Sequence, residues 1–195
     1  MRIIGLCGRS GSGKTSFCEI ANDLGFYVID CDAVYREIVS KRTPCLDELE
    51  AYFGNDVVEN DCLNRKKLAQ IVFSNKQKLQ KLNEITHKHI TEKIDSMLKE
   101  MPDDANVILD APTLFESGVD KICETIVCVI ADDETCISRI IERDGITREA
   151  AVARLSNQPE NEFLESVCDE VIKNDSTPEA LCAASKALLT KVKNI

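Results

Sequence analysis

Short apolar runs alternate with longer amphipathic segments along this chain. Residues 13–24 carry Phe17, Ile20, Ala21 and Leu24 at the i, i+3, i+4, i+7 spacing of one helical face. Runs of Val and Ile separated by helices are typical of a parallel sheet that is covered on both faces, so the pattern predicts an α/β fold. The predicted strands are Arg2–Cys7, Phe26–Asp30, Asn106–Asp110, Thr125–Ala131 and the less apolar Glu170–Lys173.

The segment between the second and third of these strands is too long for a simple crossover. Its apolar positions are spaced for helices, so we expect a helical substrate-side insertion at about 35–104 within a core formed by 1–34 and 105–195. We expect one apolar stripe of this insertion to be buried, formed by Leu79, Leu82, Ile90, Ile94, Met97 and Leu98.

The last helix is predicted to begin at Thr177, with Pro178 in its first turn. We expect it to bury Leu181, Ala184, Leu188 and Val192.

Charge and hydropathy narrow the range of partners. The 24 Lys and Arg residues against 34 Asp and Glu give a net charge of −10, which disfavours binding to nucleic acid or anionic lipid. No apolar run approaches the roughly 18 residues that a membrane span needs, and the N-terminus lacks the features of a signal peptide. We therefore expect a cytoplasmic protein with a small-molecule partner, and the sequence does not indicate its oligomeric state.

The chain has ten cysteines and no C-x-x-C pair, so the sequence indicates neither a zinc ribbon nor a thioredoxin-like site. We expect many of them to be small buried hydrophobic residues in a reducing compartment.

The strongest motif is Gly8–Thr15, which matches G-x-x-x-x-G-K-[ST] in full. Its glycines allow successive backbone N–H groups to wrap an anion, and the helix that follows directs its positive end at the phosphates. Lys14 is then placed to reach the β- and γ-phosphates, and Thr15 to offer a hydroxyl to Mg²⁺. The motif follows an apolar strand and opens an amphipathic helix, so we predict that the chain binds ATP.

Two carboxylates, Asp30 and Asp32, follow the second predicted strand. Strand ends in such sheets face the ligand crevice, where a carboxylate can accept the proton of a substrate hydroxyl. The alternative role for either residue is a helix N-cap. We choose Asp32 as the base; Cys31 would then lie near the site.

Asp110 closes the third predicted strand. It either supports Mg²⁺ through water or forms a turn before Pro112, and the sequence favours neither.

Four arginines gather between 139 and 154, with Gly145 as a flexible point. A mobile lid at about 143–158 would bring guanidinium groups to the transferred phosphate and exclude water. A solvated helix face with i, i+4 partners is the alternative, and we favour a functional role for Arg143.

Several classes of nucleotide-binding protein remain at this point. No N-K-x-D segment is present to recognise guanine, and motor or AAA-type ATPases usually need a larger chain. The residues therefore favour a small-molecule kinase. A kinase for another nucleotide, nucleoside or small alcohol and a non-catalytic nucleotide-binding regulator remain as alternatives.

Taken together, these segments resemble the dephospho-coenzyme A kinases over nearly the whole chain. The resemblance is carried most specifically by I-D-x-D at 29–32, D-x-P-x-L-F-E at 110–116 and R-x-x-x-R-D at 139–144. Further similar segments are 63–73, 82–90, 145–158 and 169–175.

The resemblance implies a P-loop kinase fold with a five-stranded parallel sheet, a helical domain on the coenzyme A side and a lid. It implies ATP-dependent phosphorylation of the ribose 3′-hydroxyl of dephospho-coenzyme A. Asp32 would face that hydroxyl, Arg143 would clamp phosphate, and Arg65, Phe73 and His87 would lie on the acceptor side. The residues expected to hold ATP are Gly8, Gly11, Ser12, Gly13, Lys14, Thr15, Ser16, Arg139 and Asn174, with Thr15 and Asp110 toward Mg²⁺.

The chain departs from the family pattern at three places. Members commonly have a second glycine and an apolar residue where Arg9 and Ser10 stand here, and Lys88 and Thr113 are also unusual. We expect Arg9 to add positive charge beside the phosphates and to affect substrate affinity more than reaction type.

Overall fold

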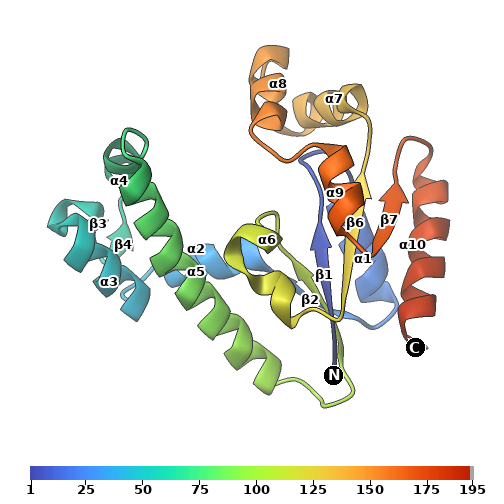
Figure 1. The fold of residues 1–195 in the computed structure, drawn as a ribbon, viewed down its shortest axis with the longest axis horizontal. Helices are drawn as coiled ribbons and strands as arrows, with labels where there is room; N and C mark the ends of the chain where they lie inside the picture. Colours follow the sequence, from blue (N-terminus) through green and yellow to red (C-terminus); the bar gives the residue numbers. More distant parts are fainter. Residues whose placement is uncertain (194–195) are drawn as a thin grey trace. The chain divides into compact units, whose positions relative to one another are not determined.

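The computed structural model describes residues 1–193 and has the predicted α/β architecture (Figure 1). The chain divides into two units. The first contains 1–29 and the chain from 103 onward, and the second is Asp30–Pro102. None of the helices in the described chain is both long and apolar enough to cross a membrane.

A five-stranded parallel sheet forms the centre of the first unit, in the order β2-β5-β1-β6-β7. All five predicted strands are confirmed, to within one residue at each end. Because the strands are parallel, the segments that follow them leave from one edge of the sheet, where ligands bind in such folds. The strands are β1 (Arg2–Cys7), β2 (Tyr27–Asp30), β5 (Asn106–Asp110), β6 (Thr125–Ile130) and β7 (Glu170–Lys173).

Helices cover both faces of the sheet. On one face, α1 (Lys14–Asp23) packs beside α10 (Pro178–Lys193), and Phe17 joins Ile4 and Leu6 of β1 in the main core. The other face holds α6 (Leu114–Ser117), the 3₁₀ turn η2 (Val119–Ile122) and α9 (Asn161–Val167). A Cβ at Gly5 would lie 2.9 Å from Leu114 Cδ2, so glycine at this strand position lets α6 approach the sheet closely.

The buried face of α10 differs from the prediction at one position. Ala184 is exposed and Ser185 is buried, together with Leu181, Leu188 and Val192. The apolar spacing alone did not show that Ser185, and not Ala184, faces the core, because the two are neighbours at the border of the apolar stripe.

The segment expected to form a lid, at about 143–158, lies in a helical hairpin of α7 (Asp133–Asp144) and α8 (Arg148–Ser156), which we call the lid hairpin. Gly145 ends α7 with a φ of 64°, the left-handed conformation that glycine adopts most readily. The hairpin has its own small core, which includes Cys136, Ile140, Ala151 and Leu155. This helical unit begins ten residues before the expected lid boundary at 143, since α7 is continuous from Asp133.

The second unit consists mainly of helices: α2 (Cys31–Ile38), α3 (Pro44–Phe53), α4 (Arg65–Val72) and α5 (Lys76–Lys99). A short η1 turn (Asn55–Val57) leads into an antiparallel hairpin of β3 (Val58–Glu59) and β4 (Cys62–Leu63). Asn60 and Asp61 form its two-residue turn with φ of 51° and 58°. The helical pattern of the sequence did not predict this hairpin, because each of its strands has only two residues.

The core of the second unit contains Leu46, Leu49, Val57, Leu68 and Ile85. The predicted α5 stripe contributes Leu82 and Ile90, which pack against this core, and the buried Ile94 and Leu98. Leu79 is 40% exposed, so its assignment to the buried stripe was wrong. It lies in the first turn of α5, at the N-terminal end of the helix.

Candidate functional site

The phosphate-binding loop joins β1 to α1 and depends on glycine at three positions. Gly8, Gly11 and Gly13 have φ of 145°, 79° and 108°. A Cβ at Gly8 would lie 2.3 Å from Val129 O, and one at Gly11 would lie 2.6 Å from Cys136 O. Any other residue would therefore combine backbone strain with a steric clash, so local geometry accounts for these glycines.

The loop presents a positive end to an anion. Gly13 caps α1 without a side-chain hydrogen bond, and the first turn of this helix carries no acidic residue. The first N–H groups of the helix and its dipole are thus available to phosphate oxygens. Lys14 crosses the loop, and its Nζ donates to Gly8 O at 2.8 Å.

Arg139 and Asn174 contact the backbone of the loop itself. Arg139 donates to Gly11 O and to Asn174 O, each at 3.2 Å. The Asn174 side chain, 5% exposed, donates to Ser12 O at 2.8 Å. Both residues were predicted to contact the nucleotide; in this structure they hold the carbonyl groups of the loop and so direct its N–H groups the other way.

The hydroxyl residues of the motif differ in their surroundings. Thr15 and Ser16 are exposed at the start of α1, whereas Ser12 is fully buried and its Oγ has no hydrogen-bond partner within residues 1–193. Exposed hydroxyls at this position are accessible to a ligand. Ser12 contributes its backbone, through Ser12 O, to the contact with Asn174.

Asp110 lies beside α1, near Cys18. It pairs in register with Leu6 near the end of β1, and Cys18 Sγ approaches its Oδ2 at 3.8 Å. Cys18 is three residues after Thr15, so both project from neighbouring positions of the same helix. A carboxylate and a hydroxyl are therefore presented from β5 and α1.

The two carboxylates after β2 have different surroundings. Asp30 is the N-cap of α2: it accepts from Ala33 N at 3.0 Å and pairs with Arg36 at 3.2 Å. Asp32 lies in the first turn of α2, is exposed, and has no hydrogen-bond partner among the described residues. Cys31, between them, is buried. The capping role thus belongs to Asp30, which leaves Asp32 available for other chemistry.

Three residues of the second unit were expected on the acceptor side. The Arg65 guanidinium lies 5.2 Å from the centroid of the Tyr35 ring, a cation–π contact. Burial raises the pKa of the Tyr35 hydroxyl, and Arg65 opposes that rise. Phe73 is 84% exposed, and His87 is half-buried on α5. Phe73 is therefore accessible to a ligand, although single exposed apolar side chains are common on protein surfaces and do not by themselves indicate one.

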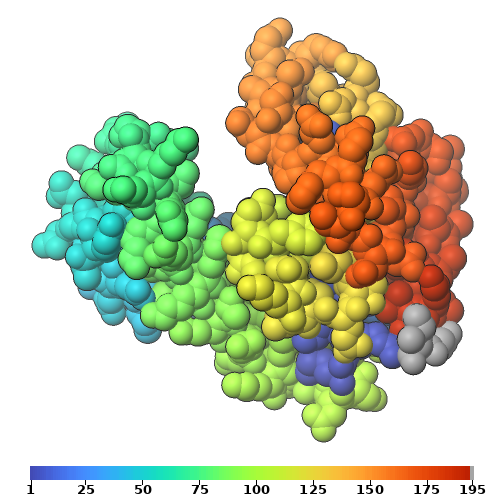
Figure 2. Space-filling model, viewed as in Figure 1, coloured from blue at the N-terminus to red at the C-terminus, as the bar shows by residue number. Residues whose placement is uncertain are grey.

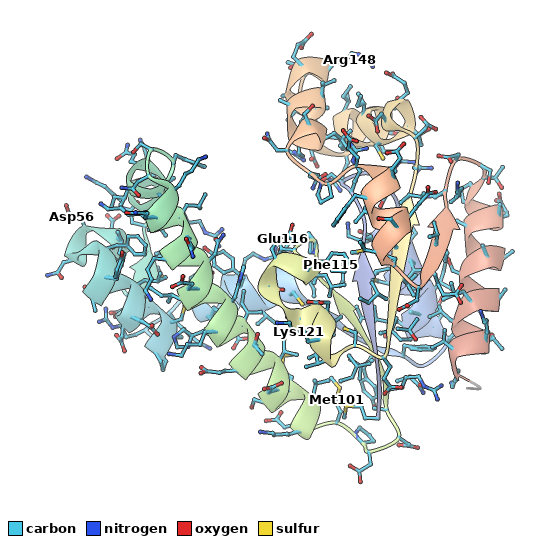
Figure 3. The ribbon with its side chains drawn as sticks, viewed as in Figure 1. Asp56, Met101, Phe115, Glu116, Lys121 and Arg148 are labelled. Atoms are coloured by element: carbon cyan, nitrogen blue, oxygen red, sulfur yellow. The ribbon has the colours of Figure 1, made fainter. Side chains whose placement is uncertain are left out.

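The lid arginines lie on an exposed surface. Arg143 donates to the Asp144 carboxylate at 2.7 and 3.0 Å, and Arg154 also binds Asp144. These hydrogen bonds hold the pKa of Asp144 well below its usual range. Arg148 pairs with Glu134 and lies at the outer end of the lid (Figure 3). Arg143 is 57% exposed, so its present partner is one that water or phosphate could replace.

A pocket of 210 Å³ adjoins the beginning of the loop within the first unit. The α6 segment and α9 lie side by side near it (Figure 2), and Phe115 meets Phe163 edge to face at a centroid distance of 6.2 Å. Figure 3 shows Phe115 and Glu116 on the turn of α6. Backbone, apolar and amide groups thus surround one space, lined in part by Gly8, Pro112, Phe115, Gln158, Pro159 and Leu164.

Sequence reasoning did not single out Gln158, which binds the loop through both ends of its amide. Gln158 Oε1 accepts from Ser10 N at 2.9 Å, and its Nε2 donates to Ser10 Oγ at 3.3 Å. The only available signal was its place at the end of the lid segment. Arg9 also differs from expectation: it is buried and pairs with Asp133.

Comparison with solved structures supports this architecture. A Thermus thermophilus protein matches with a TM-score of 0.82 and 29% identity, covering 97% of each chain. The dephospho-CoA kinase from Campylobacter jejuni matches with a TM-score of 0.73 and 27% identity, covering 100% of this chain and 98% of the other. A shikimate kinase from Acinetobacter baumannii, at 15% identity and a TM-score of 0.55, shares the fold alone.

Sequence comparison identifies the family. A dephospho-CoA kinase from Fusobacterium nucleatum is 42% identical over 180 residues, which cover 92% of each chain. One from Listeria innocua is 36% identical over 195 residues, covering 97% of this chain and 94% of the relative. The family model described as dephospho-CoA kinase matches residues 2–179. The chain therefore belongs to the dephospho-CoA kinase family.

Proposed function

We propose that this kinase transfers the γ-phosphoryl group of Mg²⁺-bound ATP to the ribose 3′-hydroxyl of dephospho-coenzyme A, with Asp32 as the proton acceptor. The observation that carries the proposal is the division of roles after β2: Asp30 caps the helix, and Asp32 remains exposed and without a partner among the described residues.

The loop supplies the binding site for the phosphate chain. Three of its carbonyl groups are held by Arg139, Asn174 and Lys14. Ser10 N and Ser12 N already have partners, so the phosphates would be bound by other N–H groups of the loop and of the first turn of α1. Lys14 would exchange Gly8 O for a phosphate oxygen when ATP binds. Because these donors are already oriented, little reorganisation is needed as charge develops on the transferred group.

The residues present fit a magnesium ion. Mg²⁺ prefers oxygen ligands and retains several waters, and here Thr15 offers a hydroxyl while Asp110 offers a carboxylate from the adjacent strand. When bound, the ion would neutralise charge on the phosphate oxygens. Thr15 would hold it directly, and Asp110 would act through water.

Asp32 would orient the acceptor hydroxyl and accept its proton. Phosphoryl transfer needs the acceptor oxygen in line with the breaking bond, and one hydrogen bond from the hydroxyl to a carboxylate supplies that alignment. Arg143 would leave Asp144 and bind the transferred phosphoryl group from the lid. The proposed acceptor-side residues Arg65, Phe73 and His87 would hold the remainder of the substrate.

The pocket beside Gly8 is suited to the adenine ring of the acceptor. The 3′-hydroxyl and the base belong to one nucleoside, so a base must bind close to the phosphates of ATP. Phe115 and Leu164 offer apolar walls for a flat ring, and the amides of Asn157 and Gln158 lie at its border.

The proposal is tested by incubating the protein with ATP, Mg²⁺ and dephospho-coenzyme A and measuring both ADP and coenzyme A. We expect one of each per turnover, and no product above background would refute the assignment. A panel of other nucleotides, nucleosides and small alcohols would reveal a kinase with a different acceptor.

Asp32→Asn tests the proposed base. We expect kcat to fall by roughly 10²–10⁴-fold with ATP binding retained, since the carboxylate acts on the acceptor. Asp30→Asn is the matched control, because asparagine can also cap a helix; it should leave kcat within a few-fold of the original. Equal losses in both variants would contradict the assignment, and a pure nucleotide-binding regulator would show no turnover to lose.

A further inference from the structure

Arg9 is a charged residue whose side chain is buried. Its side chain is 6% exposed, although it belongs to the phosphate-binding loop. Its Nη1 donates to Asp133 Oδ1 at 2.5 Å and its Nη2 to Leu155 O at 3.3 Å. The guanidinium therefore faces the lid, and its charge is balanced there.

These partners stand at the two ends of the lid hairpin. Asp133 is the first residue of α7, and Leu155 is the penultimate residue of α8. The next loop residue, Ser10, is held by Gln158, just after α8. The first half of the phosphate loop is thus fastened to both ends of the lid hairpin. Its second half is held by Arg139, from the middle of α7, and by Asn174, which follows β7.

General packing does not explain this arrangement. Burying a guanidinium is unfavourable unless it is paired, and Arg9 Nε has no partner within residues 1–193 even with the pair formed. An arrangement with this cost points to a task beyond filling space.

We propose that Arg9 is a positioning residue that couples the phosphate loop to the lid, through the Asp133 carboxylate and the Leu155 carbonyl, and that it is not a phosphate ligand. The proposal rests on the proposed kinase function for its rate measurements. When the lid moves, the two ends of the hairpin carry the Gly8–Ser10 segment with them, so closure and alignment of the phosphates occur together.

The two possible roles of Arg9 predict opposite effects for Asp133. If Arg9 were a phosphate ligand, removing the Asp133 carboxylate would free a cation for the phosphates and tighten ATP binding. If Arg9 positions the loop, the same change leaves a buried guanidinium unpaired and disturbs the loop. Asp133 itself is 62% exposed, so removing Arg9 leaves a carboxylate that water can solvate.

The experiment compares Arg9→Met, Asp133→Ala and the double variant in the full chain. The measurements are kcat, the Kd for ATP without acceptor, the ratio of ADP to coenzyme A formed, and Tm. Arg148→Met is the matched control, because it removes an exposed ion pair from the same lid.

We expect Arg9→Met and Asp133→Ala each to lower kcat by about 10–100-fold. We also expect ATP Kd to change less than about threefold, because Arg9 does not touch the phosphates in this proposal. The ADP to coenzyme A ratio should rise above one, since a misaligned closed site admits water. Tm should fall more in Asp133→Ala, the double variant should be no worse than the poorer single one, and Arg148→Met should match the original protein.

Two results would overturn the proposal. Tighter ATP binding in Asp133→Ala with weaker binding in Arg9→Met would make Arg9 a phosphate ligand. A lower Tm with unchanged kcat and product ratio would make the pair merely structural. If Asp133→Ala does not fold, Arg9→Met decides, because the Asp133 carboxylate that it leaves is exposed to water; unchanged kcat and product ratio in it would refute the coupling. The ATP Kd values remain informative even if dephospho-coenzyme A is not the acceptor.

Discussion

The phosphate loop and the outer face of the lid hairpin both carry polar groups that we propose for ATP chemistry, but their surroundings differ. In the loop, polar contacts are buried and steric tolerance is small: Asn174 is 5% exposed, and a Cβ at Gly11 would meet Cys136 O at 2.6 Å. On the lid, Arg143 is 57% exposed and holds only its neighbour Asp144.

This difference in burial shows that the groups of the loop are preorganised, whereas those of the lid face can exchange partners. A buried, fully engaged loop loses little free energy to reorganisation when phosphate arrives. Exposed ion pairs contribute little to stability, so they can break at little cost when a lid arginine turns to the substrate. Changes in the loop should therefore affect both folding and rate, and changes on the lid face should affect rate alone.

Lys14→Ala should produce the largest effect, because it removes the cation of the loop. We expect kcat/KM to fall by roughly 10²–10³-fold, about 3–4 kcal/mol of transition-state stabilisation. Lys186→Ala, on the exposed side of α10, is the control and should leave the rate unchanged. A Lys14→Ala enzyme with the original kcat/KM would show that the lysine only braces Gly8.

Gly11→Ala and Gly145→Ala compare the two regions at positions that share a positive φ. Gly11 also faces backbone at 2.6 Å, whereas nothing lies within 4 Å of a Cβ at Gly145. Gly11→Ala should lower the free energy of unfolding by about 3 kcal/mol, and Gly145→Ala by about 1 kcal/mol. Urea unfolding measures both; equal losses would mean that the loop is no more tightly packed than the lid turn.

Arg143→Met should affect catalysis but not stability. We expect about a tenfold lower kcat with Tm unchanged, because the exposed pair with Asp144 contributes little to folding whereas the transferred phosphoryl group would lose a cation. Arg148→Met, in the same hairpin, should alter neither quantity. Equal kcat values in the two variants would contradict a specific role for Arg143 in catalysis.

The smallest effect concerns the pH dependence of the lid pair. The pKa of Asp144 is held below its usual range by hydrogen bonds from Arg143 and then Arg154. A lowered folded-state pKa stabilises the protein above the unfolded-state pKa of about 4, and that contribution is lost as pH falls further. The difference in unfolding free energy between the original protein and Asp144→Asn should thus be smaller at pH 3 than at pH 7. A larger difference at pH 3 would contradict the role of the pair.

Much of the fold could be predicted from local pattern. Five strands were identified because each is a short apolar run between polar segments, and the phosphate loop was found because its chemistry requires glycines and lysine in a fixed order. The β3-β4 hairpin was missed because two-residue strands have no period, and Ala184 was placed wrongly because spacing cannot distinguish adjacent edges of one stripe.

The sequence by itself determined the parallel α/β sheet, the phosphate loop and the presence of two carboxylates after β2. Only the tertiary structure decided which carboxylate caps a helix, what Arg139 and Asn174 hold, and where Arg9 points. The physical reason is the separation along the chain between the residues that interact. Strand periodicity and glycine geometry are set by neighbours in sequence, whereas the partner of a buried charge lies wherever packing brings a second group: Asp133 is 124 residues from Arg9 along the chain.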